Sequence, residues 1–222
     1  MNKKLIGVFI IIALMLGACS FGSFSPDVVV GSGKVAHETR SVSNFTSVVL
    51  EGSANVSISS GTTESVVVEA DDNILPLIET TVKNGQLVIG NKPNTNITTV
   101  SPVKVTVTMK SLQSVTLSGS GNVTASGFSG DSLSVNLPGS GNITVTGTTN
   151  NLQIKLLGSG NIMCQGLQAK SAIVRLSGSG DIQVYASQSL DASILGSGSI
   201  LYSGNPSQVN KSVSGSGSIT PK

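Results

Sequence analysis

The chain has 222 residues, of which 38% are hydrophobic, 11% are charged and 3% are aromatic, with no Trp. This length and composition exclude a disordered chain and supply enough apolar residues for a core. The apolar residues are mainly Val, Ile and Leu, which suit pleated strands and favour an all-β fold. The formal net charge of +2 includes Lys3 and Lys4, and without these two lysines 11 basic residues face 11 acidic ones. Nucleic-acid binding needs a basic surface, so we expect no nucleic-acid partner.

The first 18 residues have the pattern of a secretory signal peptide. Lys3 and Lys4 precede an apolar run over residues 5–16, which small residues follow. The run is too short to span a bilayer comfortably, which disfavours a permanent transmembrane helix. Residues 16–19, Leu-Gly-Ala-Cys, resemble the lipobox of bacterial lipoproteins, in which the cysteine is lipidated and becomes the first residue. We therefore expect a signal peptide over residues 1–18 and a lipidated Cys19.

Lipidation at Cys19 implies a position on a membrane of the cell envelope. The lipoprotein modification supplies several acyl chains, more than the two signals that stable anchoring requires. Residues 19–27 contain Ser, Gly and Pro and form the expected tether. In Gram-negative lipoproteins a residue other than Asp after the cysteine, here Ser20, directs the protein to the outer membrane. The expected location is therefore the outer membrane, on its periplasmic or surface face, if the host is Gram-negative.

Residues 28–110 have strand patterns without a strict repeat. Apolar and β-branched runs predict strands at residues 48–50, 56–58, 66–68, 87–89 and 103–107. Turn-forming residues separate these runs, and residues 72–79, with Pro76 early in the segment, are compatible with one helical turn. The pattern leaves open whether this region forms coils of the repeat that follows or a separate cap.

Residues 111–222 contain a repeat that is marked by Gly-Ser-Gly. The motif begins at six glycines spaced 18 to 20 residues apart: Gly119, Gly139, Gly158, Gly178, Gly196 and Gly215. An apolar residue stands two positions before each of these glycines, and a β-branched apolar residue stands four positions after it. Apolar residues also alternate before the motif, as at Leu133, Val135 and Leu137, which is typical of a strand with one buried face. A period of about 19 residues indicates a repeat architecture.

Each repeat is expected to form one coil of a β-helix. A segment of this length cannot bury a hairpin sheet alone, but a coil can lie parallel to the next coil and share a common interior. We predict a single-stranded parallel β-helix, right-handed as parallel crossovers generally are, that rises by about 4.8 Å per coil. The glycines are expected at corners because positive φ costs them little. Asn122, Asn142 and Asn161 follow three corners, where asparagine tolerates left-handed backbone and stacked side chains can form a hydrogen-bonded ladder.

The sequence predicts no catalytic residue, no metal and no cofactor. Glu69, Asp71 and Asp72 are the densest acidic group and offer oxygen ligands for a hard cation, but a solvated turn is the favoured explanation for them. Cys164 is the only cysteine besides Cys19, and it occupies a position that is mostly apolar in the other repeats. A packing role for Cys164 is therefore expected instead of a nucleophilic one.

Two tyrosines are the candidates for ligand binding. Tyr185 and Tyr202 lie in the C-terminal coils, where an aromatic ring can stack against a sugar. Carbohydrate-cleaving β-helices also need paired acids or a basic residue in a groove, whereas Asp131, Asp181 and Asp191 are scattered singly. The ligand itself remains unknown.

Three segments resemble the opening of the head GIN domain, a family labelled as autotransporter adhesins. They are residues 45–58 (FTSVVLEGSANVSI), 66–76 (VVVEADDNILP) and 84–89 (NGQLVI). The Gly-Ser-Gly-Asn coils are similar to the later part of the same family, so the likeness covers about residues 34–220, with residues 28–110 as the N-terminal β region. The resemblance implies a secreted or lipid-anchored bacterial protein and supplies no site residues. The chain departs from the autotransporter label because its anchor signal is Cys19.

These observations favour a non-enzymatic, lipid-anchored envelope protein that presents a β-helical face to a glycan or protein. One alternative is a polysaccharide-cleaving β-helix enzyme, and another is a structural envelope subunit, which an uncapped apolar last coil would indicate. Lys211 replaces an apolar residue in the last coil, and Pro221 follows soon after. A charge and a proline at the last edge disfavour further strand addition and end-to-end polymerisation. The oligomeric state stays open.

Overall fold

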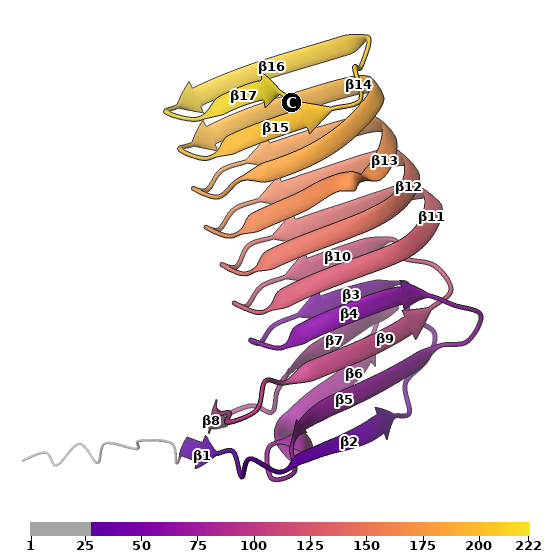
Figure 1. Cartoon of the computed structure of the whole chain (residues 1–222), viewed down its shortest axis with the longest axis vertical. Helices are drawn as coiled ribbons and strands as arrows, with labels where there is room; N and C mark the ends of the chain where they lie inside the picture. Colours follow the sequence, from indigo (N-terminus) through magenta and orange to yellow (C-terminus); the bar gives the residue numbers. More distant parts are fainter. Residues whose placement is uncertain (1–27) are drawn as a thin grey trace, which may run out of the picture.

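The structure is a computed structural model that describes residues 28–222, which are wound into a β-rod (Figure 1). The right-handed parallel β-helix predicted from the repeat is confirmed. Within the described range, the only helix is a three-residue 3₁₀ turn, Leu75–Leu77, so no helix there is long and apolar enough to cross a bilayer. The predicted signal peptide, Cys19 and the tether lie outside the described residues.

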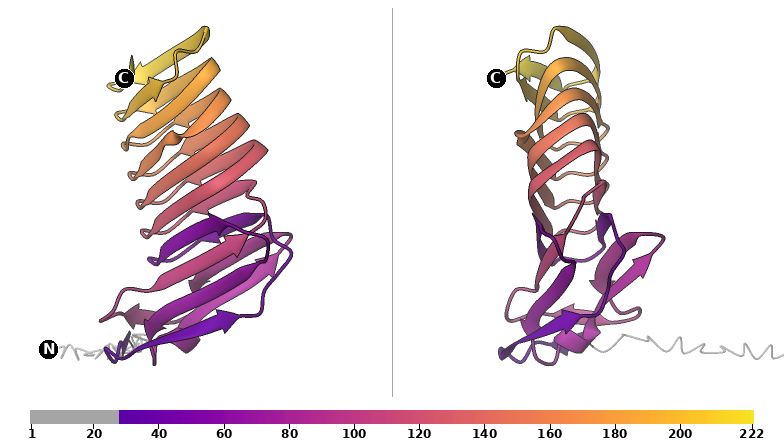
Figure 2. Two further views of the ribbon diagram at one scale, coloured as in Figure 1. Left: turned by 45° about the vertical axis from the view of Figure 1, so that its right-hand side comes forward. Right: turned by 90° about the vertical axis from the view of Figure 1, so that its right-hand side faces the viewer.

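Each regular coil is one long strand that bends in its middle. The four long strands are β11 (Asn122–Leu137), β12 (Asn142–Leu156), β13 (Asn161–Leu176) and β14 (Ile182–Gly196). The segment after each Gly-Ser-Gly corner lies on one flat face, here the first face, and the segment before the next corner lies on the opposite, second face (Figure 2). We call the bend between them, residues 126–131 of β11 and its counterparts, the wide bend. In Figure 1 the corners lie at the left edge of the rod and the wide bends at the right.

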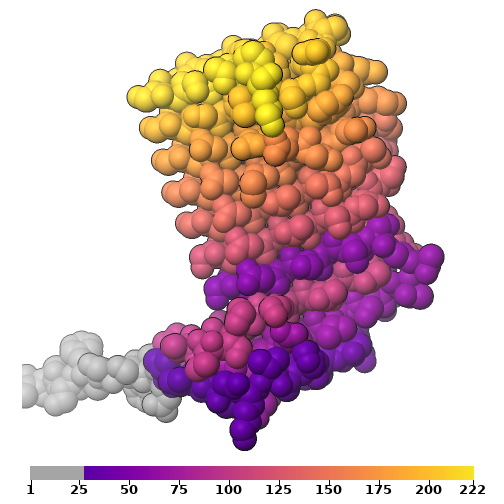
Figure 3. Space-filling view, viewed as in Figure 1, coloured from indigo at the N-terminus to yellow at the C-terminus, as the bar shows by residue number. Residues whose placement is uncertain are grey.

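Both faces continue as parallel sheets beyond the regular coils. The first face has the order β9 (Lys104–Met109), β4 (Asn55–Ser60), β11, β12, β13, β14, β15 (Ser199–Ser203) and β17 (Ser218–Pro221). The second face has the order β7 (Gln86–Asn91), β3 (Ser47–Leu50), β10 (Ser114–Leu117), β11, β12, β13, β14 and β16 (Gln208–Gly215). Figure 3 shows these levels as stacked layers.

An early segment forms the coil next to the repeat. Val48 of β3 pairs with Val115 of β10, and Asn55 of β4 pairs with Asn122 of β11. The corner between β3 and β4, residues 52–54, is Gly-Ser-Ala and stacks in phase with the Gly-Ser-Gly corners. The chain therefore completes this coil, forms the outer parallel strands β7 and β9 and most of the cap with residues 61–113, and then returns beside the coil.

Strands from both before and after this coil in the sequence close the N-terminal end of the stack. Antiparallel strands β5 (Ser65–Asp71), β2 (Val35–Arg40) and β6 (Ile78–Lys83) cover the last parallel levels, while β1 (Val28–Val30) and β8 (Asn96–Thr98) pair separately. All five strands predicted in this region are present, and the predicted helical turn is the 3₁₀ turn before β6. Residues 28–110 thus contain both coils and a cap, and the antiparallel cap covers the parallel edge.

The corner glycines are required for a reason other than the predicted one. Among the six first glycines of the motif only Gly215 has a positive φ, so the expectation of left-handed corners was wrong. A Cβ added to Gly139 would instead overlap the carbonyl oxygen of Gly119, and one on Gly158 would overlap that of Gly139. The corners stack backbone on backbone, which only a residue without a side chain permits.

The asparagines after the corners form the predicted ladder. The Nδ2 atom of Asn122 donates to Oδ1 of Asn55 (2.9 Å), Asn142 donates likewise to Asn122 (3.0 Å), and Asn161 to Asn142 (3.1 Å). None of these residues has positive φ, so the left-handed backbone that the sequence suggested for them was wrong. Hydrogen bonding between coils explains their positions.

The two faces enclose one apolar core that runs from the cap to the last coil. The apolar residues two before and four after each corner are buried, except Val213, which is 46% exposed. Lys211 occupies an inward position of the same strand, paired with buried Ala192. Its Nζ donates to the carbonyl of Ile219 (3.2 Å) and lies 4.6 Å from the centre of the Tyr202 ring. The end of the core is therefore covered by a lysine and a tyrosine.

Candidate ligand-binding groove

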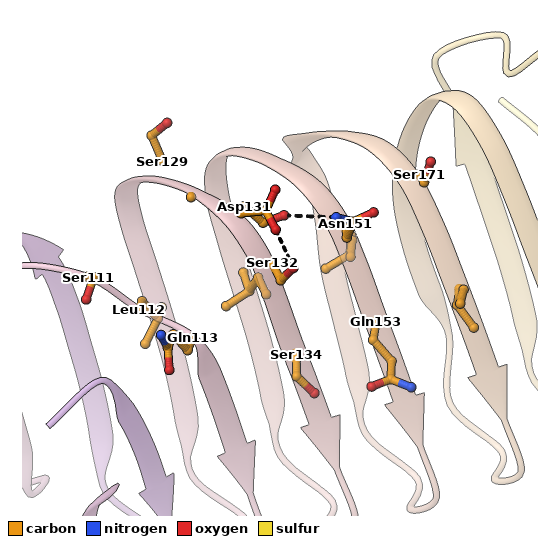
Figure 4. Close-up of a pocket in the computed structure, with 14 residues that line it drawn as sticks. Ser111, Leu112, Gln113, Ser129, Asp131, Ser132, Ser134, Asn151, Gln153 and Ser171 are labelled. Carbon is orange, nitrogen blue, oxygen red and sulfur yellow. Dashed lines mark hydrogen bonds between the residues drawn. The ribbon is translucent and has the colours of Figure 1, made fainter. Parts of the chain in front are cut away.

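A groove of about 730 Å³ lies on the second face beside the wide bend (Figure 4). Strands β11, β12 and β13 supply its floor and one side, because alternate residues of a strand point outward. Leu133 and Leu152 are buried, while their neighbours Ser132, Ser134 and Gln153 face the groove. Residues 111–113 form its end wall, where the chain returns from the cap to begin β10.

Most side chains that line this groove carry hydroxyl or amide groups. They are Ser111, Gln113, Ser129, Ser132, Ser134, Asn151, Gln153 and Ser171. Among the lining residues the one carboxylate is Asp131, and the one exposed large apolar side chain is Ile173. Because successive coils are about 4.8 Å apart, these groups form rows at regular spacing along the rod.

Asp131 is held in place at the wide bend. Its Oδ1 accepts a hydrogen bond from Asn150 (2.8 Å) and its Oδ2 accepts one from the Ser132 hydroxyl (3.2 Å). The hydrogen bond from Asn150, then that from Ser132, and the positive charge of Lys170 keep the pKa of Asp131 below its ordinary value. A general acid needs a raised pKa, so Asp131 at neutral pH is suited to accept hydrogen bonds from a ligand and unsuited to donate a proton.

A second hollow of about 550 Å³ continues the groove around the wide bend. Ser129 and Gly130 line both hollows, and Lys170 and Tyr185 line only the second. The two hollows together give a continuous path that begins on the second face and ends at the ring of Tyr185. The predicted candidate Tyr185 therefore lies beside the groove.

The other predicted candidate lies elsewhere. Tyr202 pairs with Val184, whose side chain is inside the rod, and its ring packs against the end of the core beneath Lys211. Tyr185 pairs with Gln168 and points outward at the wide bend. The structure does not bring the two tyrosines into one site, and only Tyr185 borders a hollow.

The acidic group of the cap is used for internal contacts. Glu69 accepts a hydrogen bond from Lys104 Nζ (2.8 Å) and lies 3.3 Å from His37 Nδ1. Asp72 accepts a hydrogen bond from the Ser32 hydroxyl, and the buried Asp71 accepts the backbone amides of residues 100 and 101 (3.0 and 3.2 Å). The three acids diverge, and residues 28–222 contain no group of three or more metal-ligating side chains.

The environments of Asp71 and Cys164 affect their pKa values in opposite directions. Hydrogen bonds from the side chain and backbone of Ser101, together with backbone amides of neighbouring residues, lower the pKa of Asp71 despite its burial. Burial raises the pKa of the Cys164 thiol to about 12. Cys164 lies within the core, and such a thiol is a poor nucleophile. The predicted lipidation residue, Cys19, lies outside the described residues.

The residues of the groove were not singled out by the sequence. Gln113, Asn151 and Gln153 occupy outward positions, where polar residues are expected on any exposed strand. These residues line a groove because residues 111–113, returning from the cap, form its end wall. This contact between distant segments leaves no signal in the local sequence.

The structure is a capped β-solenoid with a surface groove that is lined mainly by hydroxyl- and amide-bearing residues. Residues 44–206 match the family described as "Putative auto-transporter adhesin, head GIN domain". The match covers most of the chain, and the protein belongs to this family. Membership in an adhesin-like family associates it with the cell envelope or surface.

Solved structures of other bacterial proteins have the same fold. A "putative adhesin" of Bacteroides fragilis NCTC 9343 is 24% identical with a TM-score of 0.72, over 87% of this chain and all of that one. A "putative lipid binding protein" of Parabacteroides distasonis ATCC 8503 is 26% identical with a TM-score of 0.61, over 88% of this chain and all of that one. A "putative adhesin" of Parabacteroides merdae ATCC 43184 is 22% identical with a TM-score of 0.59, over 88% of this chain and 99% of that one. A search of curated proteins gave no match.

Proposed function

We propose that this protein is a non-enzymatic, lipid-anchored envelope protein that binds a glycan in the groove of the second face. The observation that carries the proposal is the lining of the groove, in which hydroxyl and amide groups repeat from coil to coil. Such groups donate and accept hydrogen bonds, as sugar hydroxyls do. Tyr185 at the far end offers an aromatic face against which a sugar ring can stack.

The same lining favours a polar ligand over two alternatives. Hydrolysis of a polysaccharide requires two carboxyl groups that flank the bond, whereas Asp131 is the one carboxylate among the residues that line the groove. The protein from P. distasonis is described as a "putative lipid binding protein", but an acyl chain needs an enclosed apolar cavity, and eight of the residues that line this open groove carry hydroxyl or amide groups. Binding of a glycan is the function that these side chains support best.

A structural role as an end-to-end subunit has one observation in its favour. Val209 and Val213 are 36% and 46% exposed at the last coil, where β16 pairs on one side with β14. Lys211 stands between them and covers the Tyr202 ring. A subunit that stacked here would have to displace or bury that ammonium group, which disfavours the contact.

The groove proposal can be tested with the unlipidated chain that lacks residues 1–19. The whole described core lies within the retained chain. We expect this protein to be retained on a panel of envelope polysaccharides, peptidoglycan and host glycans. Replacing Asn151 and Gln153 with Ala should weaken retention on the ligand found by at least tenfold, because several hydrogen bonds are lost. Replacing Thr144 and Gln183 on the first face should leave it unchanged.

Two outcomes of that experiment would contradict glycan binding in the groove. One is no retention on any member of the panel, and the other is equal loss in the groove and first-face variants. Release of shortened polysaccharide by the wild type, lost in Asp131→Asn, would instead support the enzyme.

The lipid anchor needs its own test in the intact cell. Palmitate should label the wild type and fail to label Cys19→Ala, because the thiol is the acceptor of the lipid. Equal labelling of both proteins would refute the anchor while leaving the groove proposal intact.

A further inference from the structure

Four exposed valines gather at the capped end of the rod. Val28 and Val30 of β1, Val35 of β2 and Val100, two residues beyond β8, are 55%, 59%, 50% and 63% exposed. We call this group the basal patch. Most large apolar side chains of the described region are inside the rod, so four half-exposed valines at one end require an explanation.

Two valines of the basal patch lie on the outer face of the small β1–β8 sheet. In β1 and β8 the inward residues, Val29 and Ile97, pack against the core, while Val28 and Val30 point away from it. Val100 comes close to the turn between β1 and β2, since a Cβ on Gly33 would lie 3.6 Å from Val100 Cγ1. The valines thus come from different segments but share one end of the molecule, opposite the last coils (Figures 1 and 3).

Polar contacts hold this end rigidly. Asn73 Nδ2 donates to the carbonyl of Val30 (2.7 Å), and the amide of Ser32 donates to Asn73 Oδ1 (2.8 Å). Asp71 accepts the amide of Val100 at 3.0 Å. Because these hydrogen bonds fix β1 and residue 100 to the cap, the patch and the rod keep one relative orientation. A surface that binds the patch therefore also orients the rod.

The chain enters the described region within the patch itself. Eight residues, 20–27, separate Cys19 from Val28. Fully extended, they span at most about 29 Å at 3.6 Å per residue. A lipid on Cys19 would therefore keep the basal patch near the bilayer, while no such constraint acts on the last coils.

We propose that the basal patch rests on the lipid surface, with its valines in the boundary between headgroups and acyl chains, so that the rod stands upright. The proposal rests on the lipid anchor at Cys19 given above. The anchor supplies the affinity, and the patch, held at high effective concentration, supplies the orientation. Exposed Lys34, next to Val35, can keep its ammonium group among the headgroups while its stem lies along the apolar surface. The glycan-binding groove then faces sideways above the membrane.

A single tryptophan can report this contact, because the chain has none. The chain from residue 19 onward is coupled through Cys19 to a maleimide-headgroup lipid in phosphatidylcholine–phosphatidylglycerol vesicles. The buried Cys164 thiol should not compete for the maleimide. In Val100→Trp we expect emission to shift to shorter wavelength and to be quenched by brominated lipids. In Ser216→Trp, at the exposed last corner, we expect neither change.

A matched variant tests the valines themselves. Val28→Thr and Val30→Thr together keep β-branched side chains in β1 but remove apolar surface, and adding them to Val100→Trp should reduce the quenching of its indole. Equal quenching at both reporter positions, or none at Val100→Trp, would overturn the upright orientation. A wavelength shift in lipid-free protein that grows with concentration would show that a second copy covers the patch and would also refute the proposal. Since the coupling is chemical, these outcomes are independent of whether cells lipidate Cys19.

Discussion

At the scale of single residues, the corner glycines determine how closely the coils can stack. Each second glycine of the motif is as constrained as the first, since a Cβ on Gly160 would overlap the carbonyl oxygen of Gly141. The intervening serines, such as Ser159, lie outside the core and are free of this constraint. The Gly-Ser-Gly motif therefore reflects close contact between the backbones of neighbouring coils. The hydroxyl of its serine has no packing role.

Close stacking predicts different results for two glycine-to-alanine substitutions. Gly160→Ala should lower the free energy of unfolding by more than about 2 kcal/mol, because the neighbouring coil must move away. Gly130→Ala, where nothing lies within 4 Å of the added Cβ, should change it by less than about 1 kcal/mol. Urea unfolding followed by circular dichroism measures both. Similar losses in the two variants would contradict the stacking explanation.

The sequence predicted the positions of these residues better than their roles. The period located the six Gly-Ser-Gly corners, and the alternation located the buried Leu, Ile and Val residues of the repeat. A glycine at a turn, however, is most often explained by a backbone with positive φ. The local sequence does not show whether a given glycine is needed for that reason or because another backbone segment passes close to it. The ladder of Asn122, Asn142 and Asn161 was predicted, but its first member, Asn55, belongs to a coil that the period does not reveal.

At the scale of elements, the cap depends on a carboxylate buried among amides. Asp71 ends β5 and accepts hydrogen bonds from residues 100 and 101, which follow β8. A Cβ on Gly31 would overlap its Oδ2 atom, so the turn after β1 packs tightly against it. One side chain thus joins three segments that are distant in sequence.

The lowered pKa of Asp71 predicts how the cap responds to acid. The ionised form stabilises the fold above the unfolded pKa of about 3.9, and this stabilisation is lost as pH falls through the lower folded value. Asp71→Asn should therefore lower the melting temperature at pH 7 and reduce its dependence on pH below about 4. Thermal melts between pH 3 and pH 7 measure this, and a variant as acid-sensitive as the wild type would count against the role of Asp71.

The wide bends absorb the differences in coil length. Register shifts occur between Ala125 and Phe128 in β11 and between Thr144 and Gly147 in β12, whereas residues on both sides of a Gly-Ser-Gly corner keep one register. Bulges are tolerated where a strand already bends. The sequence indicates coils of 18 to 20 residues. It does not reveal whether the corners or the wide bends accommodate the difference in length.

At the scale of the whole molecule, the core is one continuous apolar stack with unequal ends. The N-terminal end is closed by antiparallel strands, while the last coil leaves β16 exposed along its length. In a solenoid each coil contacts only its neighbours, so opening is expected to begin at the less protected end.

Thiol reactivity can measure this gradient. Cys164 lies in a central coil with a pKa of about 12, so Ellman's reagent should react with it at pH 8 only as fast as the rod unfolds globally. The thiol of Ile200→Cys, at a position that is equally buried but lies in the last full coil, should react orders of magnitude faster. Equal rates for the two thiols would mean that the rod opens as a single unit.

The concave shape of the groove could not be predicted from the sequence. The alternation predicts that Asn151 and Gln153 point outward, but the concavity arises where residues 111–113 return from the cap. Residues 111–113 lead into β10, which pairs with the coil of residues 47–60, and much of the cap lies between the two in the sequence. Such topology is decided by the packing of distant segments, which has no signature in a local window.

The backbone-on-backbone corners also bear on how this architecture can evolve. Because neighbouring coils meet at the corners without interlocking side chains, one coil is nearly equivalent to another as a place for duplication or loss. Bulges at the opposite edge accept the change in length, and the cap and the last coil are left as they were. A lineage can therefore lengthen or shorten the rod by whole coils, altering the reach of the molecule while it keeps the same two ends.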